Sequence, residues 1–212
     1  MVKQERAERT LRRIVTAAAE RFEETGYSGT SLDDITRAAG VSKGAFYFHF
    51  ASKKQIADTV VEHSYGLLED LIEASCGAGV PALQQLIDLT HGLNRLLLTE
   101  PTVRTALRFH REWADLEPEF DHYTLWHGAI EQLLGHAAEQ GELRKDMPSG
   151  AAQVVAVVTL FSVESLTVRQ ATRDQETAHR VTDLWNVLLA ALVPGSPDDL
   201  LRTGAPEPCE AV

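Results

Sequence analysis

The chain has little of what a disulfide framework or a metal site needs. Its 212 residues include only two cysteines, Cys76 and Cys209, which are too few and too far apart in the sequence for either role. So low a cysteine content is typical of a reducing compartment. We therefore expect a cytoplasmic, nucleoid-associated protein that uses no metal and no cofactor.

Long hydrophobic runs are also missing. The longest, Val154 to Val168, is broken by Ser162, Glu164 and Ser165 and is shorter than the roughly 20 apolar residues that cross a bilayer. The N-terminal stretch from Lys3 to Arg13 is charged and lacks the apolar segment of a signal peptide. The sequence therefore predicts a soluble protein with no membrane partner.

Positive charge is scarce in the chain as a whole, where the net charge is −11. Its distribution is uneven, because residues 1–54 hold ten Lys and Arg against seven Asp and Glu. Residues 55–212 hold ten against twenty-four. Since phosphate repels an acidic surface, we expect only the N-terminal end to face nucleic acid.

Neither β alternation nor an internal repeat is present, and nearly every segment has apolar residues at helical spacing. This pattern predicts an all-α fold of about nine helices. We expect a three-helix DNA-binding domain at residues 1–52 and a ligand-binding and dimerisation domain at residues 53–194 that begins with a long connector helix. Residues 195–212 are expected to form a mobile tail.

The last two predicted helices, at about residues 150–171 and 177–192, differ in character. The first is apolar nearly all round, and the second has a regular apolar stripe. Two such helices need more cover than one bundle readily provides, so they predict a homodimer through a four-helix interface. The alternative is that both helices fill a large monomeric core.

Residues 28–49 contain two short helical patterns separated by a glycine. Thr30 and Ser31 can cap the first pattern, and Ser42 can cap the second, which begins at Lys43. Gly40 supplies the positive φ that reverses the chain between them. Two short helices joined by such a turn predict a helix-turn-helix motif.

The second helix of this motif is expected to enter the major groove of DNA with its N-terminal residues at the base edges. Lys43 can bind guanine O6 and N7, while Gly44 and Ala45 allow a close approach. Hydroxyl, phenol, imidazole and cationic side chains around it can reach phosphates. The predicted DNA contacts are Arg6, Thr30, Ser31, Ser42, Lys43, Gly44, Ala45, Tyr47, His49 and Lys53.

Aromatic residues fill the second helix and its end. We expect Phe46, Phe48 and Phe50 to pack inside, which leaves Tyr47 and His49 on the surface. The alternative is that Tyr47 belongs to the core, and that Lys53 is an ordinary solvated lysine.

The run TGYSGTSLDDITRAAGVSKGAFYFHFASKKQI resembles the N-terminal domain of TetR-family transcriptional regulators. The matching pattern, G-Y…T-S/T…I…A-G-V-S-K-G-x-x-Y-x-H-F-x-S-K, covers about residues 8–56. The resemblance implies an all-helical homodimer that binds a palindromic DNA operator. It also implies that a small molecule entering the C-terminal bundle releases the DNA.

A subgroup resemblance extends further. The segments QERAERT, YFHF and the tryptophan in DHYTLWHGAIEQLL are similar to the γ-butyrolactone hormone receptors of antibiotic-producing actinobacteria. This similarity implies that Trp126 lies over the ligand, in a pocket that is mostly apolar with a few polar groups. The candidate ligand contacts are Ser64, Thr90, His110, Tyr123, Trp126, Thr159, Phe161 and Ser162, each of which can equally be plain core.

Several alternatives stay open. Receptors of this subgroup tend to have a glutamine near the position of Ser64 and small residues near Phe161, so an antibiotic or its intermediate is as good a ligand as a butyrolactone. A repressor of a drug-efflux or catabolic gene, a helical adaptor and a helical metal-dependent enzyme are the other function classes. His122 and His127 are five residues apart, which does not fit a metal-binding helix face.

Overall fold

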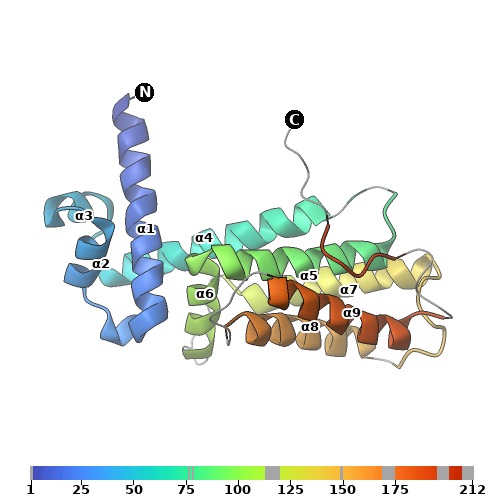
Figure 1. Ribbon diagram of the computed structural model, residues 1–212. Coiled ribbons are helices and arrows are strands. Elements are labelled where there is room, and N and C mark those ends of the chain that lie inside the picture. Colours follow the sequence, from blue (N-terminus) through green and yellow to red (C-terminus); the bar gives the residue numbers. More distant parts are fainter. Residues whose placement is uncertain are drawn as a thin grey trace. The chain divides into compact units, whose positions relative to one another are not determined.

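A computed structural model describes residues 2–75, 77, 79–112, 120–148, 150–168, 175–194 and 201–206. Within these ranges the chain forms nine helices and no strand, which confirms the predicted all-α class (Figure 1). Residues 113–119 and tail residues 195–200 and 207–212 lie outside the described residues. The helices are α1 (Val2–Gly29), α2 (Leu32–Ala39), α3 (Lys43–His49), α4 (Lys53–Ser75), α5 (Ala82–Thr99), α6 (Pro101–Glu112), α7 (His122–Glu139), α8 (Ala151–Val168) and α9 (Gln175–Leu192).

The helices group into two compact units. The N-terminal unit comprises Met1–Leu67 and Glu100–Asp121, and the C-terminal unit comprises Leu68–Thr99 and His122–Val212. Helix α4 therefore has residues in both, and α6 belongs with α1, α2 and α3. Contact grouping does not test independent folding, so the domain boundary at residues 52 and 53 stays a prediction.

The N-terminal unit is built around α1, which packs against α2 and α6. Gly26 has a φ of 74° and breaks the helical geometry of α1 near its end, a conformation that glycine adopts without steric cost. The core is formed by large apolar side chains from α1, α2, α3, α4 and α6. Its fully buried members are Ile14, Phe22, Ile35, Phe46, Ile56, Val60 and Phe109.

Polar contacts fasten α6 to α1. Arg104 Nε lies 2.8 Å from Glu23 Oε1, and the Thr105 hydroxyl donates to Ala19 O at 2.8 Å. Arg108 donates to the carbonyl oxygen of Phe22 at 3.3 Å. Three side chains from two turns of α6 therefore donate hydrogen bonds to α1. Hydrophobic periodicity does not reveal these contacts.

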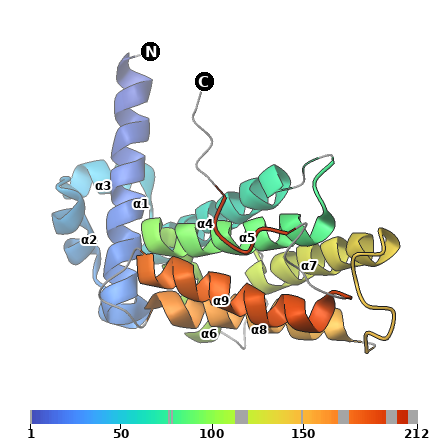
Figure 2. The ribbon, with the colours of Figure 1, turned by 45° about the vertical axis from the view of Figure 1, so that its right-hand side comes forward.

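The C-terminal unit has α5 at its centre, packed against α7, α8 and α9 (Figure 2). Glu142, which follows α7, accepts the backbone N–H groups of Ala82 and Leu83 at 3.0 and 2.8 Å. A carboxylate in this position satisfies two of the free donors at the start of α5 and complements its dipole.

Two glycine-to-alanine substitutions test how closely the helices of this unit pack. A Cβ added to Gly128, inside α7, meets no described atom within 4 Å. Gly128→Ala should therefore raise the free energy of unfolding by about 0.5–1 kcal/mol, because alanine loses less backbone entropy in a helix. Urea denaturation measures this change.

The matched control is Gly92→Ala. A Cβ at Gly92 of α5 would overlap the side chain of Leu71 from the end of α4. We expect this substitution to lower the urea midpoint. Equal effects of the two substitutions would contradict the close approach of α5 to Leu71.

In the part of the chain that the structure describes, no helix is both long and apolar enough to cross a membrane.

Candidate DNA-binding surface and ligand site

The geometry of the helix-turn-helix motif matches its predicted signals. Ser31 Oγ accepts the N–H of Asp34, and the Asp34 carboxylate accepts the N–H of Ser31, both at 3.2 Å. The Ser31 hydroxyl also donates to the Asp34 carboxylate, and this bond, together with the one from the Ser31 N–H, lowers the pKa of Asp34. Gly40 has a φ of 60° and a ψ of 39°, and Ser42 Oγ accepts the N–H of Ala45 at 3.1 Å. The predicted caps at Ser31 and Ser42 and the glycine turn are confirmed.

Helix α3 is anchored by one face. Phe46 and Phe50 are buried four residues apart, which places them on the same side of a helix. The prediction that Phe48 is also buried is wrong, since its side chain is 77% exposed. Alternate residues share a face in a strand, whereas in a helix Phe48 lies nearly opposite Phe46.

The exposed face of α3 carries Lys43, Tyr47 and Phe48. Lys43 Nζ forms an ion pair with Asp33 Oδ1 of α2 at 2.8 Å. The hydrogen bond to Asp33 raises the pKa of Lys43, so the ammonium group is charged at neutral pH. Lys43 thus stands on the surface as a cation, with one carboxylate beside it.

Thr30 and Lys53 have structural roles. Thr30 is 3% exposed, and its hydroxyl donates to Gly26 O at 2.8 Å. Lys53 Nζ donates to Tyr27 O and Thr30 O at 2.8 and 2.9 Å, and it lies 4.4 Å from the centre of the Tyr27 ring. Both side chains therefore help to close the end of α1, and their contacts with phosphate stay predictions.

The other predicted DNA contacts lie on or near the surface. Gly44 is exposed, and a Cβ there would have as its nearest neighbour Ser42 Oγ at 3.9 Å. Arg6 is exposed in the second turn of α1, and the ring of His49 is packed edge-on against Phe48 at 5.0 Å. Their contacts with DNA stay predictions. Phe48 was missed, although the helical period of residues 43–49 places it outside.

In the C-terminal unit, Trp126 is buried within α7 with an exposed fraction of 1%. Among the described residues, its indole Nε1 finds no hydrogen-bond partner. A buried N–H without an acceptor is costly and uncommon in proteins. Trp126 therefore offers an unused donor, which is the property expected of a ligand contact.

The hydroxyl groups predicted for the same pocket are occupied within the protein. Thr90 Oγ1 donates to Ile87 O at 2.7 Å and accepts Trp185 Nε1 at 2.6 Å. Thr159 Oγ1 donates to Val155 O at 2.7 Å. Both threonines are fully buried, so their hydroxyls stabilise the core. A ligand role for either stays a prediction.

The remaining candidates are spread over the two units. Tyr123 of α7 packs against Phe161 of α8 with ring centres 5.8 Å apart. Phe161 and Ser162 line an open groove between α8 and α9 and are not shown in contact with Trp126. Ser64 and His110 belong to the N-terminal unit, and their assignment to a ligand pocket stays a prediction.

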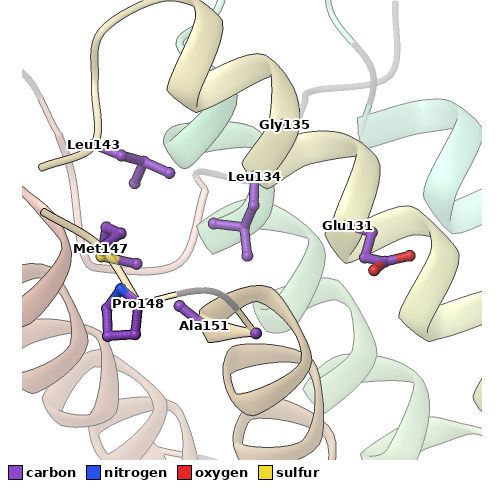
Figure 3. Close-up of a pocket in the computed structure, with 8 residues that line it drawn as sticks. Glu131, Leu134, Gly135, Leu143, Met147, Pro148 and Ala151 are labelled. Atoms are coloured by element: carbon purple, nitrogen blue, oxygen red, sulfur yellow. The ribbon is translucent and has the colours of Figure 1, made fainter. Parts of the chain in front are cut away.

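A second pocket, of about 350 Å³, lies between α7, the segment after it and the start of α8 (Figure 3). Its lining is mostly apolar, with Glu131 at one side. The residues are Glu131, Leu134, Gly135, Leu143, Met147, Pro148, Gly150 and Ala151. None of them was among the predicted ligand contacts.

Over the described ranges, no group of three or more His, Cys, Asp or Glu residues is placed to hold a metal ion. His127 Nδ1 lies 3.6 Å from Glu131 Oε2, an ordinary i,i+4 pair on α7.

The chain is similar in sequence and in fold to known proteins. The A-factor receptor protein of Streptomyces griseus is 29% identical over 195 residues, which cover 91% of this chain and 67% of that protein. A solved γ-butyrolactone receptor (ArpA-like protein) has a TM-score of 0.74 at 31% identity, covering 89% of this chain and 90% of its own. CprB of Streptomyces coelicolor A3(2), solved with its biological operator sequence, has a TM-score of 0.72 at 31% identity, with the same coverage.

Two family descriptions match the chain. Residues 14–60 match bacterial regulatory proteins of the tetR family, and residues 80–194 match the tetracyclin repressor-like C-terminal domain. Together with the relatives, these matches confirm the predicted function class, a ligand-responsive DNA-binding regulator. The chain belongs to the TetR family of bacterial transcriptional regulators.

Proposed function

We propose that this chain is a homodimeric repressor that binds a palindromic operator through α3 and leaves it when a γ-butyrolactone-like molecule binds near Trp126. The observation that carries this proposal is the pairing of two features. Helix α3 is capped and anchored while its outer face stays free, and Trp126 holds a buried donor for which the described chain provides no acceptor.

The outer face of α3 can read DNA directly. Lys43 can bind a guanine edge, and the exposed ring of Phe48 suits the methyl group of thymine. Tyr47 can donate its phenol to a phosphate. A homodimer presents two such helices, which fit half-sites about one helical turn, or roughly 34 Å, apart.

An exposed apolar surface on α8 and α9 supports the homodimer. Val154, Val157 and Phe161 of α8 and Val187 of α9 are each between 48% and 71% exposed. Surfaces of this kind usually mark an interface. A two-fold interface uses the same surface of each copy, so the pair of helices is suited to self-association.

The small molecule is assigned from Trp126. A lactone carries a carbonyl oxygen that accepts a hydrogen bond, and an acyl chain that suits apolar surroundings. Two relatives are named for A-factor and for γ-butyrolactone. Helix α4 has residues in both units, so a shift of this helix on ligand binding can change the spacing of the two α3 helices.

Titration of the protein–operator complex tests this function. The operator is first obtained by selection from random duplexes, and its fluorescence anisotropy is followed as γ-butyrolactones of different acyl length are added. Release by at least one lactone is expected. If lactones have no effect but an antibiotic or an efflux substrate releases the DNA, the lactone assignment is wrong and the efflux or antibiotic alternative replaces it.

Removing the carboxylate beside Lys43 should strengthen DNA binding. Asp33→Asn frees the ammonium group of Lys43 and removes a negative charge that faces the phosphates. We expect operator affinity to rise several-fold at low salt and the gain to shrink as salt is added. The control is Asp58→Asn, which breaks an exposed ion pair with Lys54 on α4. A loss of affinity in Asp33→Asn would instead assign Asp33 to positioning Lys43.

A further inference from the structure

The C-terminal segment 201–206 lies beside α5, as the dark-red stretch in both ribbon views shows (Figures 1 and 2). The Gln84 side chain forms two hydrogen bonds with the backbone of this segment, one as donor and one as acceptor. Gln84 Nε2 donates to Arg202 O at 3.1 Å, and the N–H of Arg202 donates to Gln84 Oε1 at 2.7 Å. One amide side chain thus pairs with both backbone groups of a residue 118 positions away.

Two further side chains of α5 continue this contact. Arg202 Nη2 lies 3.0 Å from Asp88 Oδ1, and Thr203 O lies 2.9 Å from His91 Nε2, which donates to it. Gln84 Nε2 also donates to Asp88 Oδ1 at 2.9 Å. Because these residues are three or four positions apart, they share one face of the helix.

The α5 side of this contact is shielded from solvent, whereas the Arg202 side chain is 46% exposed. Gln84 is 8% exposed and His91 is 4% exposed, values that are unusual for such polar side chains. Buried polar groups of this kind need partners, and the backbone of residues 202 and 203 supplies them. The contact of residues 202 and 203 with α5 is therefore specific and not an accidental approach of the tail.

We propose that the face of α5 formed by Gln84, Asp88 and His91 is an intramolecular docking site, and that residues 201–206 close over it as a detachable strap. The strap holds α5 from one side, while Thr90 of the same helix holds Trp185 of α9 through a hydrogen bond. Docking of the strap therefore restrains the central helix of the C-terminal unit. This inference does not depend on the ligand or on the operator.

Hydrogen–deuterium exchange of the full chain tests the strap. Residues 201–206 should exchange more slowly than an unstructured peptide, because the N–H of Arg202 is bonded to Gln84. Gln84→Leu should speed their exchange about tenfold, the effect expected for losing two hydrogen bonds. The matched control is Gln132→Leu, at an exposed glutamine of α7, which should leave the exchange of residues 201–206 unchanged.

A variant of the strap and exchange of the unchanged protein also test the docking. Arg202→Ala removes the ion pair with Asp88 but keeps both backbone bonds to Gln84, so it should speed exchange of the strap less than Gln84→Leu does, with no loss of exchange protection in α7 and α8. Exchange of residues 201–206 at the unstructured rate in the unchanged protein would overturn the proposal. Protection that falls on dilution would show that the strap comes from a second copy, which would overturn docking within one chain.

The strap should also respond to pH. Burial lowers the pKa of His91 below its ordinary value of about 6.5. The hydrogen bond to Thr203 O of the strap works against this lowering; of the charged groups facing the ring, Asp88 of α5 favours protonation and Arg202 of the strap opposes it. His91 is therefore neutral when the strap is docked. A proton added at Nδ1 would find no hydrogen-bond acceptor among the described residues.

Release of the strap exposes the ring to solvent, so the pKa of His91 should return toward its ordinary value and protonation should then favour release. Docking should be full above about pH 6.5 and should weaken as the pH falls below that value. After correction for intrinsic exchange, residues 201–206 should exchange several-fold faster at pH 5.5 than at pH 7.5. His91→Gln keeps an N–H donor but cannot be protonated, so it should remove this difference. An unchanged pH response in His91→Gln would exclude His91 as its source.

Discussion

Replacing Lys43 by alanine is expected to weaken operator binding by about two orders of magnitude, because each copy of the dimer loses one direct base contact. Lys43 lies on the exposed face of α3 and forms an ion pair with Asp33 on the surface. The substitution should therefore leave the fold intact. Fluorescence anisotropy with the selected operator measures the affinity, and circular dichroism checks the helical content.

Lys54→Ala is the control for charge. Lys54 is an exposed lysine of α4, paired with Asp58 four residues on, and it lies outside the helix-turn-helix motif. We expect at most a small, salt-dependent loss of affinity, as for any cation near DNA. Equal losses in the two variants would mean that Lys43 contributes charge alone, and the assignment of α3 as the recognition helix would fail.

Trp126→Phe should have opposite effects on stability and on ligand binding. Phenylalanine keeps most of the buried ring but removes the Nε1–H, which has no acceptor within the described chain. The free protein should be as stable as before or up to about 1 kcal/mol more stable, because a buried unpaired donor is lost. The affinity for the ligand should fall about tenfold, the effect expected for one lost hydrogen bond. Operator binding without ligand should not change.

Trp185→Phe provides the matched comparison in the same unit. Trp185 is buried like Trp126, but its Nε1 donates to Thr90 Oγ1 at 2.6 Å. Losing this hydrogen bond should lower the free energy of unfolding by about 1 kcal/mol. Thermal unfolding of the two variants with and without ligand separates the roles of the two tryptophans. Destabilisation by both would show that Trp126 has a partner in the free protein.

Local signals were enough to predict the helix-turn-helix motif. Ser31, Gly40 and Ser42 act within three or four residues of their own positions, so the capping and turn geometry follow from the sequence directly. The error at Phe48 came from applying the alternation of a strand to a helix. Counting by the helical period would have placed Phe46 and Phe50 inside and Phe48 outside.

Other features depend on contacts between distant parts of the chain. The hydrogen bond from Trp185 to Thr90 joins residues 95 positions apart, and that from Thr105 to Ala19 joins residues 86 apart. Periodicity shows that such residues face a core, but it does not show which element lies opposite. For the same reason the sequence could not show that α6 belongs with α1, or that a proline-containing tail docks on α5.

The ligand site could be predicted from the sequence only in part. Trp126 was predicted from a resemblance, and the structure adds that it is buried with an unused donor. Thr90 and Thr159 were reasonable candidates as polar residues in an apolar bundle, yet their hydroxyls bond within the core. Residue type alone does not distinguish a hydroxyl that awaits a ligand from one that is already satisfied.

Selection of DNA from a pool of random duplexes, with the unmodified protein and with Lys43→Ala in parallel, tests the central claim most directly. The unmodified protein should enrich a palindrome whose half-sites are about one helical turn apart, and Lys43→Ala should fail to enrich it. Recovery of the same palindrome by both proteins would contradict recognition through α3. Enrichment of no common sequence by the unmodified protein would contradict the proposal that this chain binds an operator.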